Sequence, residues 1–437
     1  MNFIKEIEIT NFFSIKNNLV INFESTKYTV ENHPERVFKH NNKHYSKLIS
    51  FYGANSSGKT TIIKAIAWFA YVVSNKNQDI FPKAYKNIYT KLNAKSSIKI
   101  IFILNGSEYS YEIQMLSSKN NILVGLKNEI LKIKDKSNDK YKTLFNRKKQ
   151  IFKDLNTEDI AGLLFEGLSN KTSLLVASKT RVKDYYEMLE FFRSISRFTN
   201  ISGVHHVEMQ LNPKDNFLLA IPFLEDKELM SLLDDITDKI NIDNTDKEAT
   251  KSSNDVNLKV KNFIIQCFIA MGLDITNAKA TINIDKDNTD KNSSDEIAFD
   301  VKLNMFHSIS NKKSLEFNLE SSGTKMIMKL LYNIYMASLE NSIIVFDELD
   351  SVIHPMLVPI LNLISIKLNV QMIYSTHNIY NMKFLYNDEL FLIEKDNKHI
   401  THINNVKEYN GFENFARLYE NKILGGIPTI QNINLDF

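Results

Sequence analysis

The chain has 437 residues, of which 43% are hydrophobic and 24% are charged, and its formal net charge is +3. This length supports one large domain or two of moderate size, each with its own core, and the hydrophobic content excludes disorder as the default state. A net charge so close to zero singles out neither a nucleic acid nor a membrane as a partner. The single cysteine excludes a disulfide framework and a cysteine-rich metal site.

The N-terminus and the longest apolar segment both bear on location. Met1 is followed directly by alternating apolar and polar residues, whereas a secretory signal would place a longer apolar stretch after a basic start. The segment from Thr61 to Val73 contains Lys64 and is too short to span a bilayer. We therefore expect a cytoplasmic protein without a transmembrane helix.

The first part of the chain predicts strands followed by a loop and a helix. Apolar and polar residues alternate from Glu6 to Thr10, and Val20 to Phe23 is the expected antiparallel neighbour of that strand. Leu48 to Tyr52 is a short apolar run of the kind that forms a buried strand. Helix-forming residues without glycine or proline then run from Thr61 to Val73.

The middle of the chain predicts a hairpin and then helices. Two alternating segments between Ile98 and Leu116 flank Asn105-Gly106, a strong signal for a two-residue hairpin turn, and so predict a small antiparallel sheet. Apolar residues recur with helical spacing from about Asp154 to Arg197 and again from Glu225 to Gly272. These two segments predict a helical insertion.

From Leu319 onward the pattern returns to alternating helices and buried strands. Helices are predicted over Met326 to Ser338 and Met356 to Leu368, and strands over Ser342 to Phe346 and Val370 to Tyr374. This alternation is typical of an α/β sheet, so the sheet that begins before the insertion is expected to continue here.

One segment carries the sequence pattern of a phosphate-binding loop. Residues 53–60 fit G-x-x-x-x-G-K-[ST] between a predicted strand and a predicted helix, which is the context that a phosphate-binding loop requires. Its backbone N–H groups and the helix N-terminus would hold phosphate oxygens, Lys59 would reach the β- and γ-phosphates, and Thr60 would take a Mg²⁺ position. The residues predicted to bind ATP here are Gly53, Asn55, Ser56, Ser57, Gly58, Lys59, Thr60 and Thr61.

Asp347 and Glu348 end the predicted strand from Ser342 to Phe346. Two adjacent carboxylates at the end of a buried strand are costly unless a cation or a water molecule to be activated lies nearby. We expect Asp347 to help hold Mg²⁺ and Glu348 to act as the general base. Taken alone, the pair could also be a helix N-cap cluster, but the phosphate loop in the same chain favours the catalytic interpretation.

Two weaker motifs accompany these. Ser322-Gly323 opens a predicted helix about twenty residues before the acids and by itself would be an ordinary N-cap. His377 follows the next buried strand, where it could contact a γ-phosphate or be a structural histidine. The order of all the motifs along the chain favours the functional interpretation of both.

This ordered set resembles the ATPase head of the ABC and SMC superfamily, and in particular the RloA/OLD-type AAA ATPases of bacterial anti-phage and abortive-infection systems. The narrower resemblance rests on Asn11-Phe12-Phe13-Ser14-Ile15-Lys16, Glu320-Ser321-Ser322-Gly323-Thr324, Asp347-Glu348-Leu349-Asp350 with His354-Pro355 beyond it, and Gly425-Gly426-Ile427-Pro428. It covers most of the chain. The implied fold is α/β, a P-loop ATPase head with a mixed sheet and flanking helices, plus a helical insertion lobe and a small antiparallel sheet.

The resemblance also implies how the motifs work together. In that superfamily two heads enclose two ATP molecules, so the chain is expected to form a homodimer or a higher homo-oligomer through its nucleotide sites. Ser322 and Gly323 would act across this dimer, Asp350 would lie in the D-loop and His377 would be the switch histidine. Lys59, Glu348 and His377 are the expected catalytic residues, with ATP and Mg²⁺ as cofactors. The signature departs from the usual Leu-Ser-Gly-Gly-Gln, because Ser321, Thr324 and Lys325 replace the leucine, the second glycine and the glutamine. The Q-loop glutamine is not assigned.

The expected function is that of an ATPase sensor or regulator in anti-phage defence. The sixty residues after His377 are too few for the nuclease domain that OLD proteins carry, so a separate effector nuclease is expected. The leading alternative is a RecF/SMC-like ATPase of DNA repair or recombination, and a third is a scaffold that binds ATP without turnover. Contact with nucleic acid is possible through the basic run from Lys127 to Lys153, although a solvated hairpin face is the favoured interpretation.

We therefore predict four parts in the chain. Two polar stretches within the insertion, Asp234 to Asp255 and Asp285 to Glu296, are expected to be flexible loops or hairpin tips. The parts are the N-terminal half of the ATPase head with the phosphate loop (1–75), an antiparallel β segment (76–153), the helical insertion (154–296) and the C-terminal half of the head with the signature, acids, D-loop and switch histidine (297–437).

Overall fold

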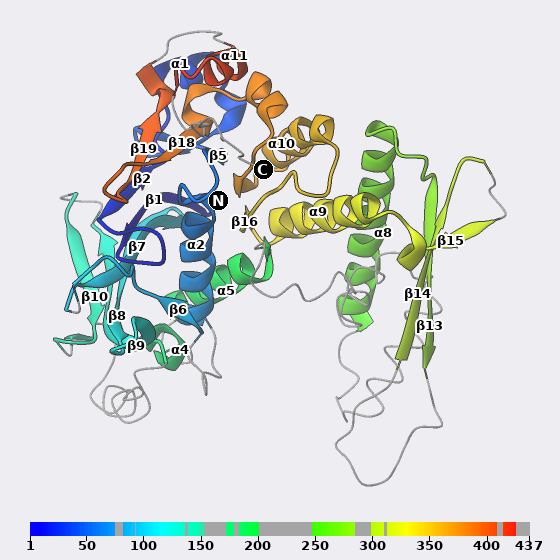
Figure 1. The fold of residues 1–437 in the computed structure, drawn as a ribbon. Coiled ribbons are helices and arrows are strands. Elements are labelled where there is room, and N and C mark those ends of the chain that lie inside the picture. The colour runs from blue at the N-terminus through cyan, green and yellow to red at the C-terminus, as the bar shows by residue number, and fades with distance from the viewer. Residues whose placement is uncertain are drawn as a thin grey trace. The chain divides into compact units, whose positions relative to one another are not determined.

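The computed structural model divides the chain into two compact units (Figure 1). Unit 1 comprises Met1–Ser202, Met336–Ser351 and Leu361–Phe437, and unit 2 comprises Gly203–Tyr335 and Val352–Ile360. The residues that the structure describes are 1–74, 82–91, 93–135, 139–149, 151–152, 172–178, 183–200, 247–284, 299–309, 313–408 and 414–424.

An antiparallel sheet forms one half of unit 1. Within the described residues its main path runs in the order β11-β10-β9-β8-β7-β1-β2, with β6 paired to β9. The predicted antiparallel segment is thus part of a larger sheet, because β1 pairs with both β2 and β7. Its strands are β1 (Phe3–Thr10), β2 (Leu19–Asn22), β6 (Ala84–Tyr85), β7 (Ser96–Leu104), β8 (Ser107–Ser117), β9 (Ile122–Lys134), β10 (Tyr141–Asn146) and β11 (Ile151–Phe152).

The turn between β7 and β8 confirms the predicted hairpin. Leu104 pairs with Ser107 across the two residues Asn105 and Gly106. These have φ of 49° and 76°, the left-handed values that a type I′ turn needs. Asparagine and glycine adopt these values most readily, so the turn also sets the register of the long β7–β8 pair.

A second, mostly parallel sheet lies in the other half of unit 1. Its strand order within the described residues is β12-β16-β17-β5-β18-β19, and every pair is parallel except β18–β19. The strand before the phosphate loop, β5, therefore lies between β17 and β18, and the strand that ends in the two acids, β16, lies beyond β17. The strands are β5 (Leu48–Tyr52), β12 (Thr199–Asn200), β16 (Ile343–Phe346), β17 (Gln371–Ser375), β18 (Leu390–Lys395) and β19 (Thr401–Asn405).

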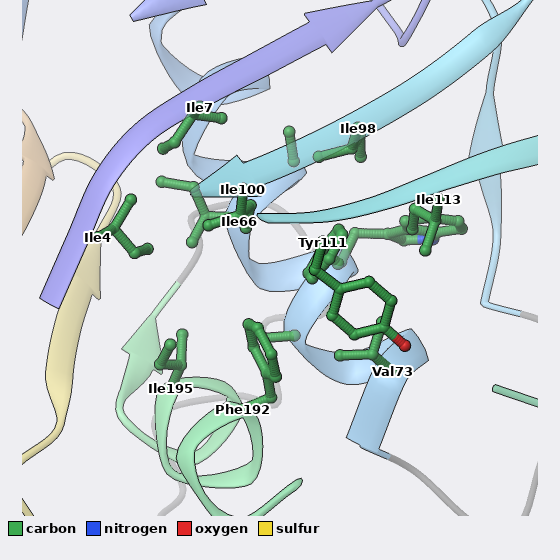
Figure 2. Packing of buried hydrophobic residues seen from close by; sticks show 14 of the residues in the cluster. Ile4, Ile7, Ile66, Val73, Ile98, Ile100, Tyr111, Ile113, Phe192 and Ile195 are labelled. Carbon is green, nitrogen blue, oxygen red and sulfur yellow. The ribbon is translucent and has the colours of Figure 1, made fainter. Parts of the chain in front are cut away.

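Helix α2 (Lys59–Ser74) lies in the core between the two sheets. All but three of its residues are buried, and it contacts β16, β17 and helix α5 (Lys183–Arg197). Figure 2 shows Ile66 and Val73 of α2 facing Ile100 and Tyr111 of the antiparallel sheet, with Phe192 of α5 beside them. A helix that is apolar on nearly all sides is stable only when it is covered on all sides, and this position holds the phosphate loop at its N-terminus rigidly.

Unit 2 contains helix α8 (Lys247–Ala270), a small sheet, and most of helix α9 (Ser322–Leu339). The sheet is antiparallel in the order β13-β14-β15 (Asn277–Ile284, Phe299–Phe306, Ser314–Glu316). The prediction of a loop from Asp234 to Asp255 is wrong for its last part, because α8 begins at Lys247. Extending an existing helix adds one hydrogen bond per residue, so a polar segment beside an apolar one can join its helix.

Short elements complete the described chain. The short elements are α1 (Lys27–Asn32), η1 (Pro34–Arg36), β3 (Val37–His40), β4 (Lys43–Ser46), α4 (Leu174–Ser178), η3 (Phe317–Leu319), η4 (Pro355–Leu357), α10 (Val358–Lys367), η5 (Ile379–Phe384), η6 (Asn387–Glu389), η7 (Val406–Glu408) and α11 (Phe415–Glu420).

None of the described helices is long and apolar enough to cross a membrane.

Most predicted elements are confirmed to within four residues at their ends, namely the strands β1, β2, β5, β16 and β17 and the helices α2, α9 and α10. The largest difference is at α9, which begins at Ser322 and not at Met326. Helices α4, α5 and α8 confirm the helical pattern where the structure describes it. The predicted segments 154–171, 225–246 and 285–296, and the tail motif 425–428, lie outside the described residues. The four predicted domain boundaries stay predictions.

Candidate nucleotide-binding site

The phosphate loop connects β5 to α2 through backbone conformations that its glycines permit. Gly53 has φ of 149° and Gly58 has φ of 123°, in the region that favours glycine. A Cβ atom on Gly53 would lie 2.2 Å from the backbone oxygen of Ile393, and one on Gly58 would lie 3.2 Å from Cγ2 of Thr401. Both glycines are therefore needed for the loop to pass so close to β18 and β19.

The rest of the loop combines an exposed tip with a buried base. Asn55 and Ser56 are exposed, and Ser56 has a left-handed φ of 65°. Ser57 is buried, and within the described residues its Oγ has no hydrogen-bond partner. The Thr61 hydroxyl lies 2.7 Å from the hydroxyl of Ser14. The loop thus leads into the N-terminus of α2, where unpaired backbone N–H groups favour an anion.

Lys59 lies inside the loop, where a phosphate chain would be bound. Its Nζ donates hydrogen bonds to the backbone oxygens of Gly53 at 2.8 Å and Ala54 at 3.1 Å. Burial lowers the pKa of Lys59, and the nearby carboxylates of Asp347 and Glu348 act in the opposite direction. These carboxylates favour the charged form of the lysine, which is the form that binds phosphate.

Asp347, which directly follows β16, lies beside Thr60 at the start of helix α2. The Thr60 hydroxyl donates to Oδ1 of Asp347 at 3.1 Å, and the Ser375 hydroxyl donates to the same oxygen at 2.5 Å. Both Thr60 and Asp347 present oxygen atoms, the ligands that Mg²⁺ prefers. The two residues predicted to hold magnesium therefore lie together and fit that ion.

Glu348 adopts a backbone conformation that is uncommon for a non-glycine residue. Its φ is 51°, and its N–H donates to the Ser375 hydroxyl at 2.8 Å. The next residue, Leu349, donates its N–H to the Ser375 backbone oxygen at 3.0 Å. Such a conformation persists only where surrounding contacts hold it, and it is found most often at functional sites. Ser375 supplies those contacts from the neighbouring strand.

Asp350 and His377 are held together just after these strands. The Thr376 hydroxyl donates to Oδ1 of Asp350 at 2.6 Å, and the N–H of His377 lies 3.2 Å from Oδ2 of Asp350. The imidazole is exposed, yet its partial desolvation and the positive charge of Lys59 lower the pKa of His377, against the opposite effect of Asp350. His377 is therefore mostly neutral near pH 7 and can accept or donate a hydrogen bond.

Ser322 and Gly323 belong to unit 2, whereas the site residues described above belong to unit 1. Ser321, rather than Ser322, accepts a hydrogen bond from the N–H of Thr324 at 3.0 Å and so caps α9. A Cβ atom on Gly323 would lie 3.2 Å from the backbone oxygen of Val352. The role of Ser322 and Gly323 in binding ATP stays a prediction.

Two residues at the site carry no role in the sequence interpretation, namely Ser375 and Thr376. Ser375 touches both Asp347 and Glu348, and Thr376 holds Asp350. The sequence offers one signal for them, because both hydroxyl residues directly follow a predicted buried strand and precede His377. Their partners follow another strand, β16, so the sequence could not assign them.

We expect Ser375→Ala to weaken the response to Mg²⁺. Without the hydroxyl, the Asp347 carboxylate loses a donor and the Glu348 N–H loses its acceptor, and each such loss costs about 1–3 kcal/mol. The Mg²⁺ concentration needed for half-maximal turnover should rise about tenfold, as measured by titrating the metal at saturating ATP. Ser365→Ala, another fully buried serine on α10, is the control, and its Mg²⁺ titration should match that of the unmodified chain.

A strand, a phosphate loop and a helix, with Lys59, Thr60 and two acids at one edge of a parallel sheet, define a P-loop ATPase site. The family described as "AAA domain, putative AbiEii toxin, Type IV TA system" matches residues 48–382, and the chain belongs to this family. A search of curated proteins finds no match.

Three solved structures are similar to the chain at low identity. They are an SMC head bound to the C-winged helix domain of ScpA (13% identity, 92% of this chain and 96% of that chain covered, TM-score 0.45), an SMC head domain from Thermotoga maritima (14%, 92% and 97%, 0.39), and an Smc head domain with an extended coiled coil bound to the C-terminal domain of ScpA derived from Pyrococcus furiosus (14%, 92% and 96%, 0.42).

Proposed function

We propose that this chain binds and hydrolyses ATP as an ABC/SMC-type ATPase and acts as a sensor or regulator in a bacterial anti-phage, abortive-infection system. One observation carries the ATPase part, namely that four residues from separate segments converge at one edge of the sheet. Lys59 and Thr60 begin helix α2 after β5, and Asp347 and Glu348 directly follow β16. The defence context is supported by the family's description, which names a toxin of a toxin–antitoxin system.

Each residue at this edge has a role in the proposed reaction. Lys59 and the loop N–H groups bind and orient the β- and γ-phosphates. Glu348 orients a water molecule and accepts its proton as the water oxygen attacks the γ-phosphorus and the bond to the β-phosphate oxygen breaks. His377, neutral near pH 7, donates a hydrogen bond to the γ-phosphate.

Thr60 and Asp347 would hold Mg²⁺. When bound, the ion neutralises negative charge on the phosphate oxygens. The serine contact to Asp347 keeps its carboxylate oriented toward Thr60, so this chain's own contribution is a preformed pair of oxygen ligands beside the phosphate loop.

The proposal extends to assembly. Two copies would enclose ATP, with Ser322, Gly323 and Asp350 of one copy completing the site of the other, and a separate nuclease would act as effector. The support is the resemblance in motif order described above. A purified chain that cleaves DNA or RNA unaided would overturn the separate effector, whereas a small nuclease that copurifies with the chain would support it.

The alternative is a RecF/SMC-like ATPase of DNA repair. ATP-dependent binding of the isolated chain to duplex DNA would favour it. Binding that is abolished by removing basic residues of the β9–β10 hairpin, such as Lys142, would assign the contact to the basic run.

The first test measures ATP turnover and oligomeric mass. We expect Lys59→Ala to lower turnover about 100-fold or more, because the variant lacks the positive charge that stabilises the phosphate being transferred. Glu348→Gln should bind ATP, fail to hydrolyse it, and accumulate as a larger ATP-bound assembly. Glu340→Gln, an acid at the end of α9 paired with Arg197, is the control and should keep normal turnover.

The outcomes separate an ATPase from a scaffold that binds ATP without turnover. Turnover that survives in Glu348→Gln would remove the general-base role. A chain that binds ATP without turnover or change of mass would favour the scaffold.

A further inference from the structure

Four buried polar side chains form a network behind the nucleotide site. We call Tyr52, Asn362, Tyr374 and Asn381 the polar hub. All four are 2% exposed or less. The Asn381 amide donates to the hydroxyls of Tyr52 and Tyr374, at 3.0 Å each, and the Asn362 amide donates to the Tyr374 hydroxyl and to the Asn381 oxygen, again at 3.0 Å each.

The hub joins the segments that carry the site residues. Tyr52 is the last residue of β5 and directly precedes Gly53, and Tyr374 directly precedes Ser375. Asn381 lies in η5, which begins two residues after His377, and Asn362 lies in α10. The four members therefore lie in four different segments, and the hydrogen bonds of the hub link these segments to one another.

Contacts continue from the hub to Asp350. The Tyr52 hydroxyl donates to the backbone oxygen of Asn378 at 3.1 Å, and the N–H of Asn378 donates to the Thr376 hydroxyl at 3.0 Å. The same Thr376 hydroxyl donates to Asp350 at 2.6 Å. A continuous chain of hydrogen bonds thus runs from the strand of the phosphate loop to Asp350, which in turn receives the N–H of His377.

Stability alone does not account for this network. Buried hydrogen bonds contribute little net free energy, and an apolar core of the same shape would be about as stable. Within the described residues, Oδ1 of Asn362 is buried without a hydrogen-bond partner, which is a further cost. Hydrogen bonds between polar groups are directional, so they fix the relative orientation of the segments that they link, which apolar contacts do not do.

We propose that the polar hub holds Asp350 and His377 in register with the phosphate loop, so that its members are positioning residues for ATP turnover. This inference rests on the proposed ATPase function. A misplacement of His377 or Asp350 would slow the chemical step, whereas ATP binding, which depends on the phosphate loop itself, would persist.

The test compares Tyr374→Phe and Tyr52→Phe with Tyr111→Phe. Each change removes one buried hydroxyl and keeps the ring. Tyr111 is equally buried, but its hydroxyl bonds Glu129 of β9 and Ser173, which directly precedes α4. We expect kcat to fall about tenfold or more in the two hub variants while KM for ATP changes less than about twofold. Tyr111→Phe should lower the melting temperature and leave kcat of the folded protein unchanged.

The outcomes decide between the possible roles. Unchanged kcat in both hub variants, with lowered melting temperatures as in Tyr111→Phe, would make the hub purely structural and overturn the inference alone. A rise in KM that matches the fall in kcat/KM would show that the hub serves binding and would also overturn it. An unmodified chain without turnover would overturn the proposed function and the hub's role together.

Discussion

Replacing Glu389 with glutamine is expected to lower the free energy of unfolding by about 3–5 kcal/mol, because it leaves the buried Arg36 guanidinium without its counter-charge. Nε of Arg36 donates to Oε1 of Glu389 at 2.7 Å, and a terminal nitrogen donates to Oε2 at 2.6 Å. The side chains are 8% and 0% exposed. A buried, bidentate pair of this kind loses far more when one partner is removed than a surface pair does.

The surroundings of the pair increase the effect. The guanidinium lies over the Tyr386 ring at 4.5 Å, and the N–H of Tyr386 donates to Oε2 of Glu389 at 2.9 Å. Burial raises the pKa of Glu389, and the Arg36 guanidinium opposes this, so the carboxylate depends on its partner to stay charged. The Ser50 hydroxyl also donates to the Glu389 backbone oxygen at 2.5 Å, which places the pair next to the strand that leads into the phosphate loop.

Urea denaturation of Glu389→Gln and of Glu31→Gln measures this difference. Glu31 pairs with Lys27 on the exposed face of α1, and its loss should change the unfolding free energy by no more than about 0.5 kcal/mol. The double variant Arg36→Met with Glu389→Leu should regain much of the lost stability, since no buried charge remains. A loss below 1 kcal/mol in Glu389→Gln would show that water reaches the guanidinium.

The second large effect is expected for Gly53→Ala, which should abolish measurable ATP binding and cost about 3 kcal/mol or more of stability. The new Cβ would lie 2.2 Å from the backbone oxygen of Ile393 and 2.9 Å from Oγ of Ser57. Ile393 belongs to β18, which is paired with both β5 and β19, so its backbone cannot move away without loss of sheet hydrogen bonds. The φ of 149° at Gly53 adds strain for any residue with a side chain.

Gly106→Ala is the matched control. Gly106 has φ of 76°, but a Cβ atom there would meet nothing within 4 Å. Its cost should be about 1 kcal/mol, from backbone strain alone, with ATP binding intact. Isothermal titration with ATP and thermal melting of both variants test this. If Gly53→Ala bound ATP as tightly as Gly106→Ala does, the loop would not need its close contact with β18.

Local features of the site follow from the sequence. Residues 53–60 determine the phosphate loop because the backbone freedom of Gly53 and Gly58, Lys59 and the helix start are all encoded within one short segment. The strand ending in Asp347 and Glu348 is equally local, because an apolar run followed by acids specifies both the burial and the chemistry. The hairpin at Asn105-Gly106 belongs to the same class.

The failures and omissions lie where distant segments meet. Helix α8 begins at Lys247, inside a stretch that its polar composition assigns to a loop, because an adjoining helix decides the conformation of a polar segment. No strand is predicted where β13 and β14 of unit 2 form, since the sequence assigns β13 to the helical insertion and β14 to the C-terminal half of the head. Strand pairing is settled by partners far along the chain, which a local pattern does not identify.

By itself, the sequence determined the phosphate loop, the acids, most strands and helices of the head and the family resemblance, since each depends on neighbouring residues. Only the tertiary structure decided that β17 lies between β5 and β16, and hence that Ser375 binds both Asp347 and Glu348. It alone also assembled the polar hub from four separate segments. Hydrogen bonds between side chains require positions within about 3 Å, and residues hundreds of positions apart reach that distance only when the whole sheet is formed.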